Sequence, residues 1–336
     1  MLKIVAHRLI SLIFVIFGVT LITFLLSHVI PGDPAGLMAG QHANAATIEK
    51  IRTQLGLNQP LWVQYADYMK AVGQGNLGLS IRTQKPVISD LANFFPATLE
   101  LVVVAFIIAL CIGIPLGVLA AVKRDSVWDN MSRFFSIGGV SIPVFFSGLL
   151  AILIFYGVLN WLPAGSRIDT SIHTPTHITG FYLLDSVLSG DMVALKSSIL
   201  HLLMPAVVLS YAQLAVIMRQ IRASMLEVMS QEYIRTAIAN GIHGYFLLVR
   251  YGLRNALIPT ITVVGTSFGS LLGGAVVTET VFDWPGMGKY VVDSIAYLDF
   301  PAIMGFTFVI SLGYVLINLV IDLLYYALNP QIRAGG

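Results

Sequence analysis

The chain has 336 residues, of which 57% are hydrophobic and only 11% are charged. A soluble globular domain carries about 25% charged residues, so this chain cannot cover itself with a polar surface, and we expect it in lipid. The net charge of +2 decides little, and a single cysteine, Cys111, excludes a disulfide within the chain.

Six apolar segments are long enough to cross a bilayer, which takes about 20 residues. They predict an all-α membrane protein with transmembrane helices over residues 9–30, 97–122, 133–160, 199–222, 256–280 and 302–327. The first segment is longer than the ~7–15 apolar residues of a signal peptide, so we expect it to stay as a span. Pro143 and Pro205 lie in the third and fourth spans and favour packing in a bundle, where neighbours can satisfy the freed carbonyls.

Basic residues gather at one set of span ends, which the positive-inside rule makes cytoplasmic. They are Lys3, Arg8, Lys123, Arg124, Arg133, Arg219, Arg222, Arg254 and Arg333. Both termini are therefore predicted in the cytoplasm, with residues 328–336 as a tail. Acidic residues such as Asp67 and Asp185 collect on the opposite side.

Two long connections fall on the outer side, residues 31–96 and 161–198. The first contains ATIEKIRTQLGL, which predicts an amphipathic helix with Ile48, Ile51 and Leu55 on one face and Gly56 as its C-cap. Long loops without structure are uncommon, so we expect an ordered outer cap or docking surface. A packed lid without a partner is the alternative.

Motifs for catalysis or metal binding fail on spacing or context. PGMGKY at 285–290 lacks the spacing of a nucleotide-binding loop. His173 and His177 are four apart, but Pro175 between them argues against a shared helical face, so we expect no metal site. The run GTSFG, with Ser267 at its centre, matches a hydrolase nucleophile elbow, yet it lies inside a predicted span instead of a strand–turn–helix. We expect no catalytic residue and no cofactor.

The same predicted span carries Gly265, Gly269 and Gly273, spaced four residues apart. Such a stripe lets helices approach closely, which compensates for a cost of about 1 kcal/mol per glycine relative to alanine. Close packing beside a transport path is the expected role. Ionisable residues within the spans are few and lie near their ends, as Glu100 and Glu279 do, which weakens the case for an ion-driven carrier.

A polar, helix-patterned stretch, residues 223–255, separates the fourth span from the fifth on the cytoplasmic side. An apolar stripe between Leu226 and Ala237 predicts one helix, which ends at Gly241. A second helix begins near Tyr245. This pattern fits a handle that another protein grips and fits equally an amphipathic hairpin on the lipid headgroups.

A family resemblance separates these alternatives. EYIRTA, then Gly241, then LRNALIP resembles the cytoplasmic coupling loop, or EAA loop, of binding-protein-dependent ABC importer permeases, in the form found in dipeptide, oligopeptide and nickel permeases. Further similar segments are HRLISLIFVIFGVTLITFLLSHVIPGDP, QLGLNQPLWVQY, GNLGLSIRTQKPV, FFPATLEL, GIPLGVLAAVKR, TETVFDWPGMGKYVVDSI and NLVIDLLYYALNPQIR. THITGFYLLD points towards the dipeptide branch, including permeases for D,D-dipeptides. One departure is Ile238-Ala239-Asn240-Gly241, where the family usually has RAKG.

The resemblance implies an ABC type I importer permease fold. Residues 1–30 would hold the N-terminal region and first transmembrane helix, residues 31–96 a periplasmic segment, and residues 97–327 the permease core. It also implies a non-catalytic subunit of a bacterial inner membrane that binds no nucleic acid. Its partners would be a second homologous permease in a heterodimer, two ABC ATPase subunits and a periplasmic binding protein that delivers di- or oligopeptides.

The resemblance places ATPase contact on six residues of the loop: Glu232, Tyr233, Arg235, Thr236, Ala237 and Gly241. The packing argument for the glycine stripe in turn predicts that the fifth span lies at the centre of the permease pair, beside the substrate path. Nickel or glutathione is the alternative substrate. A stand-alone channel or secondary carrier, and a membrane-embedded hydrolase using Ser267, are the rival functions.

Overall fold

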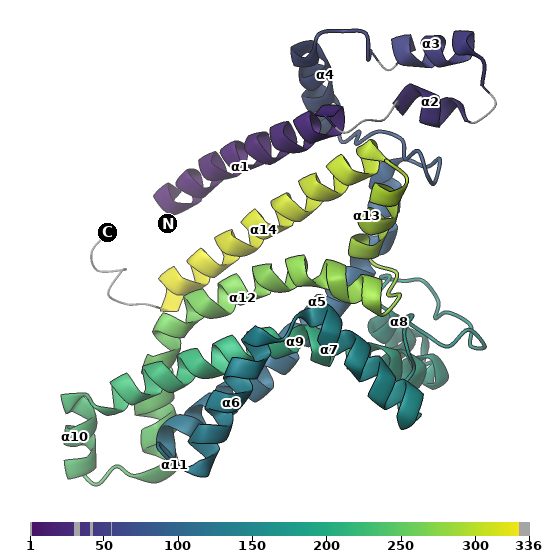
Figure 1. Cartoon of the computed structure of the whole chain (residues 1–336). Helices are drawn as coiled ribbons and strands as arrows, with labels where there is room; N and C mark the ends of the chain where they lie inside the picture. Colours follow the sequence, from purple (N-terminus) through teal and green to yellow (C-terminus); the bar gives the residue numbers. More distant parts are fainter. Residues whose placement is uncertain (1, 30–33, 41–42, 55, 329–336) are drawn as a thin grey trace. The chain divides into compact units, whose positions relative to one another are not determined.

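The computed structural model describes residues 2–29, 34–40, 43–54 and 56–328, and every regular element in these ranges is a helix. The chain divides into two compact units. Unit one comprises residues 1–97 and 285–315, and unit two comprises residues 98–284 and 316–336. Two long helices, α5 (Val87–Val122) and α14 (Phe300–Leu328), contribute turns to both units (Figure 1).

Unit one gathers short helices around the ends of longer ones. It contains α1 (Leu2–Val29), α2 (Pro34–Ala39), α3 (Ala45–Gln54), α4 (Leu61–Gly73), α13 (Met287–Ala296) and the first turns of α5 and α14. Its core joins Leu77, Val87, Leu91, Met287, Tyr290 and Ala302. A Cβ at Gly305 would lie 2.5 Å from Cγ1 of Val87, so only glycine lets α14 approach α5 this closely.

The amphipathic helix predicted near residue 50 is α3, and Ile48 and Ile51 are half-buried. Gly56 has a φ of +68°. The N–H of Leu57 donates to the carbonyl of Arg52 at 3.0 Å, the bond that closes a helix end through a left-handed glycine. The prediction of Gly56 as the cap is confirmed, whereas Leu55 lies outside the described residues.

Unit two packs long helices side by side. After the rest of α5 come α6 (Val127–Ser141), α7 (Val144–Ala151), a π-helical stretch η1 (Ile152–Val158), α8 (Tyr182–Ser189), α9 (Met192–Met229), α10 (Glu232–Ala239), α11 (Gly244–Phe246), a second π-helical stretch η2 (Leu247–Leu253) and α12 (Arg254–Val281). Buried side chains of α9, among them Ile217, Ile221 and Met225, form its core with Ala109 of α5 and Ala256 of α12.

Close crossing of α5 and α9 depends on small residues. A Cβ at Gly117 would lie 2.7 Å from the carbonyl oxygen of Met218 and 2.8 Å from Cβ of Ile221. Gly139 of α6 is just as tight, because its Cβ would lie 2.7 Å from Cβ of Ala215. Helices in lipid associate through such close backbone packing, so α9 serves as the axis on which α5 and α6 rest.

Five helices among the described residues are long and apolar enough to cross a membrane. They are Ile10–Val29, Val87–Val122, Met192–Met229, Gly244–Val281 and Phe300–Ile321. The third predicted span, 133–160, differs from the single run expected, because Val127–Gly139 and Val144–Val158 meet at an angle of 105°. Taken as one broken span, this pair brings the total to six.

The break follows from Pro143. Its neighbour Ile142 is extended, with φ −90° and ψ 121°, because a residue before proline is disfavoured in the helical region. Pro205, by contrast, stays inside α9. Pro143 was expected inside the third span, and it instead breaks that span and precedes the next helix, α7.

Candidate functional site

The predicted coupling loop, residues 223–255, folds into the end of α9, the short helix α10 and the start of a second helical rod. Ile234 and Ala237 of α10 are buried against Leu247 of η2. Met229 and Tyr251 complete this small apolar cluster. The helix α10 is therefore fixed by one face and leaves the other face open (Figure 1).

Glycine shapes the turn that follows α10. Gly241 has a φ of +81°, and the N–H of Ile242 donates to the carbonyl of Ala237 at 3.0 Å. Gly244 has a φ of +65° and begins α11. A Cβ at Gly241 would meet no atom within 4 Å, so the backbone conformation, not lack of space, is what calls for glycine here.

The structure separates the six predicted coupling residues into two groups. Glu232, Tyr233, Arg235, Thr236 and Gly241 are exposed. Ala237 is only 5% exposed and packs inside the loop. Its contribution is to hold α10 in place, so the outward surface is carried by the other five.

Three of the exposed side chains, Glu232, Tyr233 and Arg235, pair with other side chains near the loop. Arg235 pairs with Glu232 at 2.8 Å, and both are well exposed, at 71% and 84%. Asn255 donates to the Tyr233 hydroxyl at 3.1 Å, which ties α10 to the first turn of α12. An exposed ion pair of this kind contributes little stability and leaves both charges available to a partner.

Exposed apolar side chains on the same loop were missed by the sequence reasoning. Tyr245 is 80% exposed and Phe246 is 51% exposed, just after the glycine turn. Ile238, which stands where relatives usually carry a basic residue, is 42% exposed. The sequence signal was the run GIHGYF, in which two aromatic residues directly follow a glycine turn between helices.

From the loop, a continuous rod of α11, η2 and α12 runs over Gly244–Val281. It crosses the end of α9 at Gly252, whose Cβ would lie 3.2 Å from Cε of Met225 and 3.3 Å from Sδ of Met229. The loop and the fifth predicted span are thus one helical body packed on α9.

An ionic cluster joins α6 to α9 close to this loop. Asp129 of α6 has a fully buried side chain and accepts from Arg222 of α9 at 2.5 Å and 2.8 Å. Arg133 donates to the same carboxylate at 2.8 Å. The sequence reasoning used both arginines only as markers of orientation, and it had no signal for Asp129 as their shared partner.

The three glycines of the α12 stripe lie in different surroundings. A Cβ at Gly265 would lie 2.5 Å from Ile321 of α14, and Gly269 is also buried. Gly273 is exposed, and its Cβ would have no atom within 4 Å. The first two glycines therefore serve packing within this chain, and Gly273 alone faces outward.

Ser267 lies within the same uninterrupted helix and is only 2% exposed. A nucleophile elbow needs a strand, a sharp turn and an accessible serine. Ser267 meets none of these conditions. Within the described ranges, no group of three or more His, Cys, Asp or Glu side chains is arranged to hold a metal ion.

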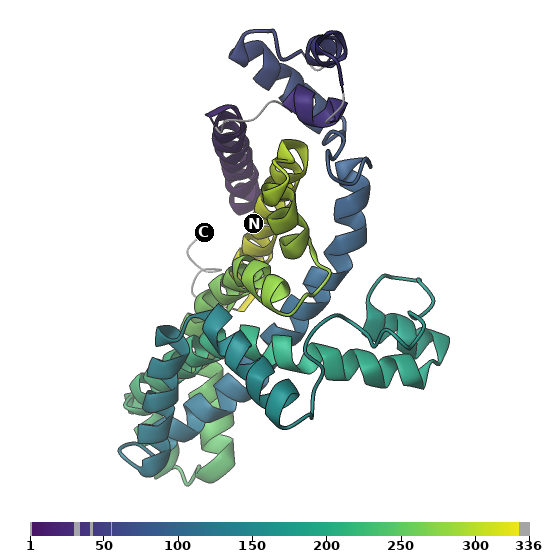
Figure 2. The ribbon, with the colours of Figure 1, turned by 45° about the vertical axis from the view of Figure 1, so that its right-hand side comes forward.

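At the far end of α9, residues 161–190 form what we call the outer cap, after the side of the membrane predicted for it from the sequence. Arg167 pairs with Glu100 of α5 at 2.5 Å, with the side chains only 7% and 5% exposed. The Arg167 guanidinium lies 3.7 Å from the ring centre of Tyr182 and donates to the carbonyl of Gly180. Figure 2 shows α8 of the cap beside the first turns of α9.

Asp185 organises the rest of the outer cap. Burial opposes its ionisation, but hydrogen bonds from the Thr179 hydroxyl and from the N–H groups of Thr179, Gly180 and Ile178 outweigh burial and hold the pKa of Asp185 below its ordinary value. The hydroxyl bond is 2.6 Å long. This long connection is therefore an ordered structure.

Together, the bundle and the coupling loop define a membrane transport subunit, and comparison with known proteins gives its family. Residues 113–334 match the model of the binding-protein-dependent transport system inner membrane component. Residues 1–102 match the model of the N-terminal part of such a membrane component. The chain belongs to this family, and the predicted family and fold class are confirmed.

Individual relatives match along their whole length. The chain is 52% identical to the probable D,D-dipeptide transport system permease protein DdpB of Escherichia coli K12, over 99% of this chain and 98% of the relative. It is 42% identical to the dipeptide transport system permease protein DppB of Alkalihalophilus pseudofirmus, over 99% and 100%. It is also 40% identical to the glutathione transport system permease protein GsiC of Escherichia coli O6:H1, over 99% of each chain.

The chain is accordingly a multi-pass inner-membrane permease subunit of an ABC importer. Such a subunit is not an enzyme, because ATP hydrolysis belongs to a separate ATPase subunit. The predictions of function class and of a non-catalytic role are confirmed.

Proposed function

We propose that the chain forms half of the translocation pathway for dipeptides, with D,D-dipeptides as the first substrates to test. The observation that carries this substrate class is the 52% identity over 99% of the chain to a relative named for D,D-dipeptide transport. A second relative at 42% is named for dipeptides.

In the assembly that we propose, a second homologous permease completes the pathway, two ABC ATPases bind below it and a periplasmic binding protein delivers the peptide. Both termini and the coupling loop lie in the cytoplasm, and residues 31–96 and 161–198 lie outside. A cysteine at position 240, in a chain whose Cys111 is replaced, should react with an impermeant thiol reagent only after the cells are opened. Labelling in intact cells would show that the chain has the opposite orientation.

Coupling to the ATPases uses the open face of α10. Glu232, Arg235 and Thr236 present polar groups there, and Tyr245 and Phe246 are exposed on the same loop. Movement of the ATPases on binding and hydrolysing ATP would displace α10. Because α10 is packed on η2, that displacement would pass into α12 as rigid-body rocking.

Uptake of labelled peptide into proteoliposomes that contain both permeases and both ATPases tests this function. With the binding protein outside, uptake of a D,D-dipeptide should require ATP inside and should stop when the ATPases are inactivated. Uptake by this chain alone would identify a stand-alone channel or carrier instead.

Glutathione is the second candidate, because one relative at 40% identity is named for its transport. Competition separates the two substrates. An excess of unlabelled D,D-dipeptide should suppress labelled dipeptide uptake, and glutathione should not. If only glutathione suppresses this uptake, we would identify glutathione as the substrate.

Gly273 is proposed to face the second permease beside the path. A leucine there should weaken association of the two permeases or block transport, and alanine should be milder, since close backbone approach is what glycine provides. Gly269→Leu should also impair transport, but by disturbing the packing within this chain. Normal assembly and transport by Gly273→Leu would place this glycine against lipid.

A further inference from the structure

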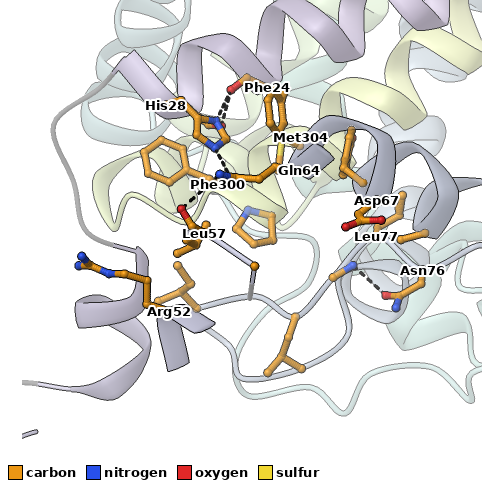
Figure 3. Close-up of a pocket in the computed structure, with 18 of the residues that line it drawn as sticks. Phe24, His28, Arg52, Leu57, Gln64, Asp67, Asn76, Leu77, Phe300 and Met304 are labelled. Atoms are coloured by element: carbon orange, nitrogen blue, oxygen red, sulfur yellow. Dashed lines mark hydrogen bonds between the residues drawn. The ribbon is translucent and has the colours of Figure 1, made fainter. Parts of the chain in front are cut away.

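A cavity of about 640 Å³ lies in unit one, apart from the coupling loop (Figure 3). Its walls come from the last turns of α1, from α4, from the loop before α5 and from the first turn of α14. Ligand pockets in proteins typically enclose about 300–1,000 Å³. The cavity is therefore large enough for a ligand, and the transport function described above leaves it unused.

The position of α4 gives the depth of this cavity in the membrane. Gln64 Oε1 lies 3.0 Å from His28 Nε2, and the hydroxyl of Thr20 donates to Sδ of Met69 at 3.5 Å. As α4 advances, it thus passes from the end of α1 towards the middle of the span Ile10–Val29. Thr20 is about 14 Å from the end of that span, or roughly half of a 30 Å hydrocarbon core.

Aromatic packing fixes α4 at this depth. The ring of Phe24 on α1 lies 5.3 Å from Tyr65 and 6.3 Å from Tyr68, measured between ring centres. The Tyr65 hydroxyl is 3.0 Å from Oγ1 of Thr20. Phe24 and Thr20 are only 4% and 2% exposed, so α4 covers the C-terminal half of α1.

The cavity therefore lies where the headgroups of a leaflet meet its hydrocarbon. It is lined by Phe24 and His28 near one span end and by Phe300, Pro301 and Met304 at the start of another. The molecules that fill the membrane at this level are phospholipids. Apolar walls suit a hydrocarbon chain, which gains free energy in proportion to the area removed from water.

The charge of a side chain that lines the cavity indicates which phospholipid headgroup it would bind. Asp67 lines the cavity at its exposed edge, and Figure 3 shows its carboxylate across the cavity from Arg52. In the described part of the chain, no hydrogen bond or ion pair engages the Asp67 carboxylate. We infer that the cavity binds an aminophospholipid of the phosphatidylethanolamine class, with its ammonium on Asp67 and a hydrocarbon chain along the apolar walls. This inference requires no particular transport substrate and holds for either orientation in the membrane.

Native mass spectrometry of the complete importer tests the inference. The complex is stripped of lipid and titrated with micelles that contain phosphatidylethanolamine or phosphatidylglycerol. The wild-type complex should retain phosphatidylethanolamine in preference. Asp67→Asn should lower that preference about two- to fivefold, the range of an exposed ion pair. Asp169→Asn, an acidic residue of the outer cap, is the matched control and should leave the preference unchanged.

Filling the cavity is the second arm. Met304→Trp and, separately, Ala71→Phe should remove the retained lipid of either class, with assembly and thermal stability checked for each variant. Retention by both folded variants, or an unchanged preference in Asp67→Asn, would overturn the inference. Displacement of the lipid by a dipeptide would instead identify a peptide site.

Discussion

The coupling loop and the outer cap stand near opposite ends of α9 and are held by opposite means. In the coupling loop, apolar side chains hold α10 from within, and its charges lie outside, as the exposed pair Arg235–Glu232 shows. In the outer cap the charges lie within, because the Arg167–Glu100 pair is almost fully buried. The coupling loop leaves its polar groups exposed, and the cap uses its polar groups to fix its own geometry.

The difference indicates which of the two regions can move at a low cost in free energy. A buried ion pair holds its partners firmly, because separating them leaves an uncompensated charge at a cost of about 3–5 kcal/mol. The contact of α10 with η2 rests on a few apolar residues and can shift without stranding a charge. The α10 end of α9 can therefore shift more readily, whereas the cap is held in place.

The largest expected effect comes from Arg167→Met. The substitution leaves Glu100 buried without its partner and should lower the free energy of unfolding by about 3–5 kcal/mol. Thermal unfolding of the purified complex measures this. The same substitution at Arg235, whose pair is exposed, should change stability by less than about 1 kcal/mol. Equal losses from the two variants would remove the contrast between cap and loop.

A smaller loss is expected from Ile234→Ala in the coupling loop. Ile234 is 1% exposed, and truncating a buried isoleucine costs about 2–5 kcal/mol. The loss should appear locally as detachment of α10, so peptide-stimulated ATPase activity of the reconstituted complex should fall while the cap stays intact. Ile238→Ala is the matched control, since Ile238 is exposed on the same helix. Full stimulation in Ile234→Ala would show that α10 needs no such anchor.

Substitutions at Gly241 should separate the cost of its backbone conformation from the effect of a side chain on the proposed ATPase contact. A side chain at a φ of +81° costs about 1–2 kcal/mol, and the open space around the position makes alanine and leucine similar in that cost. Only leucine adds bulk where the ATPase is proposed to bind. Gly241→Leu should therefore abolish uptake at a stability close to that of Gly241→Ala. Equal uptake by the two variants would argue against contact at this turn.

The smallest effect on stability is expected from Arg235→Met, at about 0.2–1 kcal/mol. Its effect on function should be larger, because the guanidinium faces the proposed partner. Co-purification of the ATPase with the permease pair should decrease, and Arg235→Lys should restore part of it. Unchanged co-purification would leave the apolar side chains, Tyr245 and Phe246 among them, as the main contact.

Local features of the fold were predictable from the sequence. Apolar run length identified five of the spans, and Gly56 and Gly241 marked the ends of α3 and α10 because left-handed turns favour glycine. The bend at Pro143 was not predictable from hydropathy, which measures how apolar a segment is and not its direction. Pro143 interrupts its span, whereas Pro205 lies inside a continuous helix, and hydropathy does not distinguish the two.

Contacts between distant residues were the main omission. Glu100 and Arg167 lie 67 positions apart, and Asp129 and Arg222 lie 93 apart. In the sequence, each looks like a charge near a span end. Only the packing of the cap on α5, and of α6 on α9, brings these charges together in buried or partly buried pairs. The same limit hid Ala237, whose motif position suggested a contact surface although its side chain faces inward.

The helical rod of 38 residues from Gly244 to Val281 has a mechanical consequence. At 1.5 Å per residue it is about 57 Å long, and about 44 Å of it follows Gly252, so a tilt of about 5° about Gly252 would move the Val281 end by about 4 Å. In the proposed mechanism, the same helical arm would receive the push beside α10 and carry it along its length. Its pivot would lie at Gly252, where Met225 and Met229 of α9 leave little room for a side chain but, being flexible, allow the arm to turn on them.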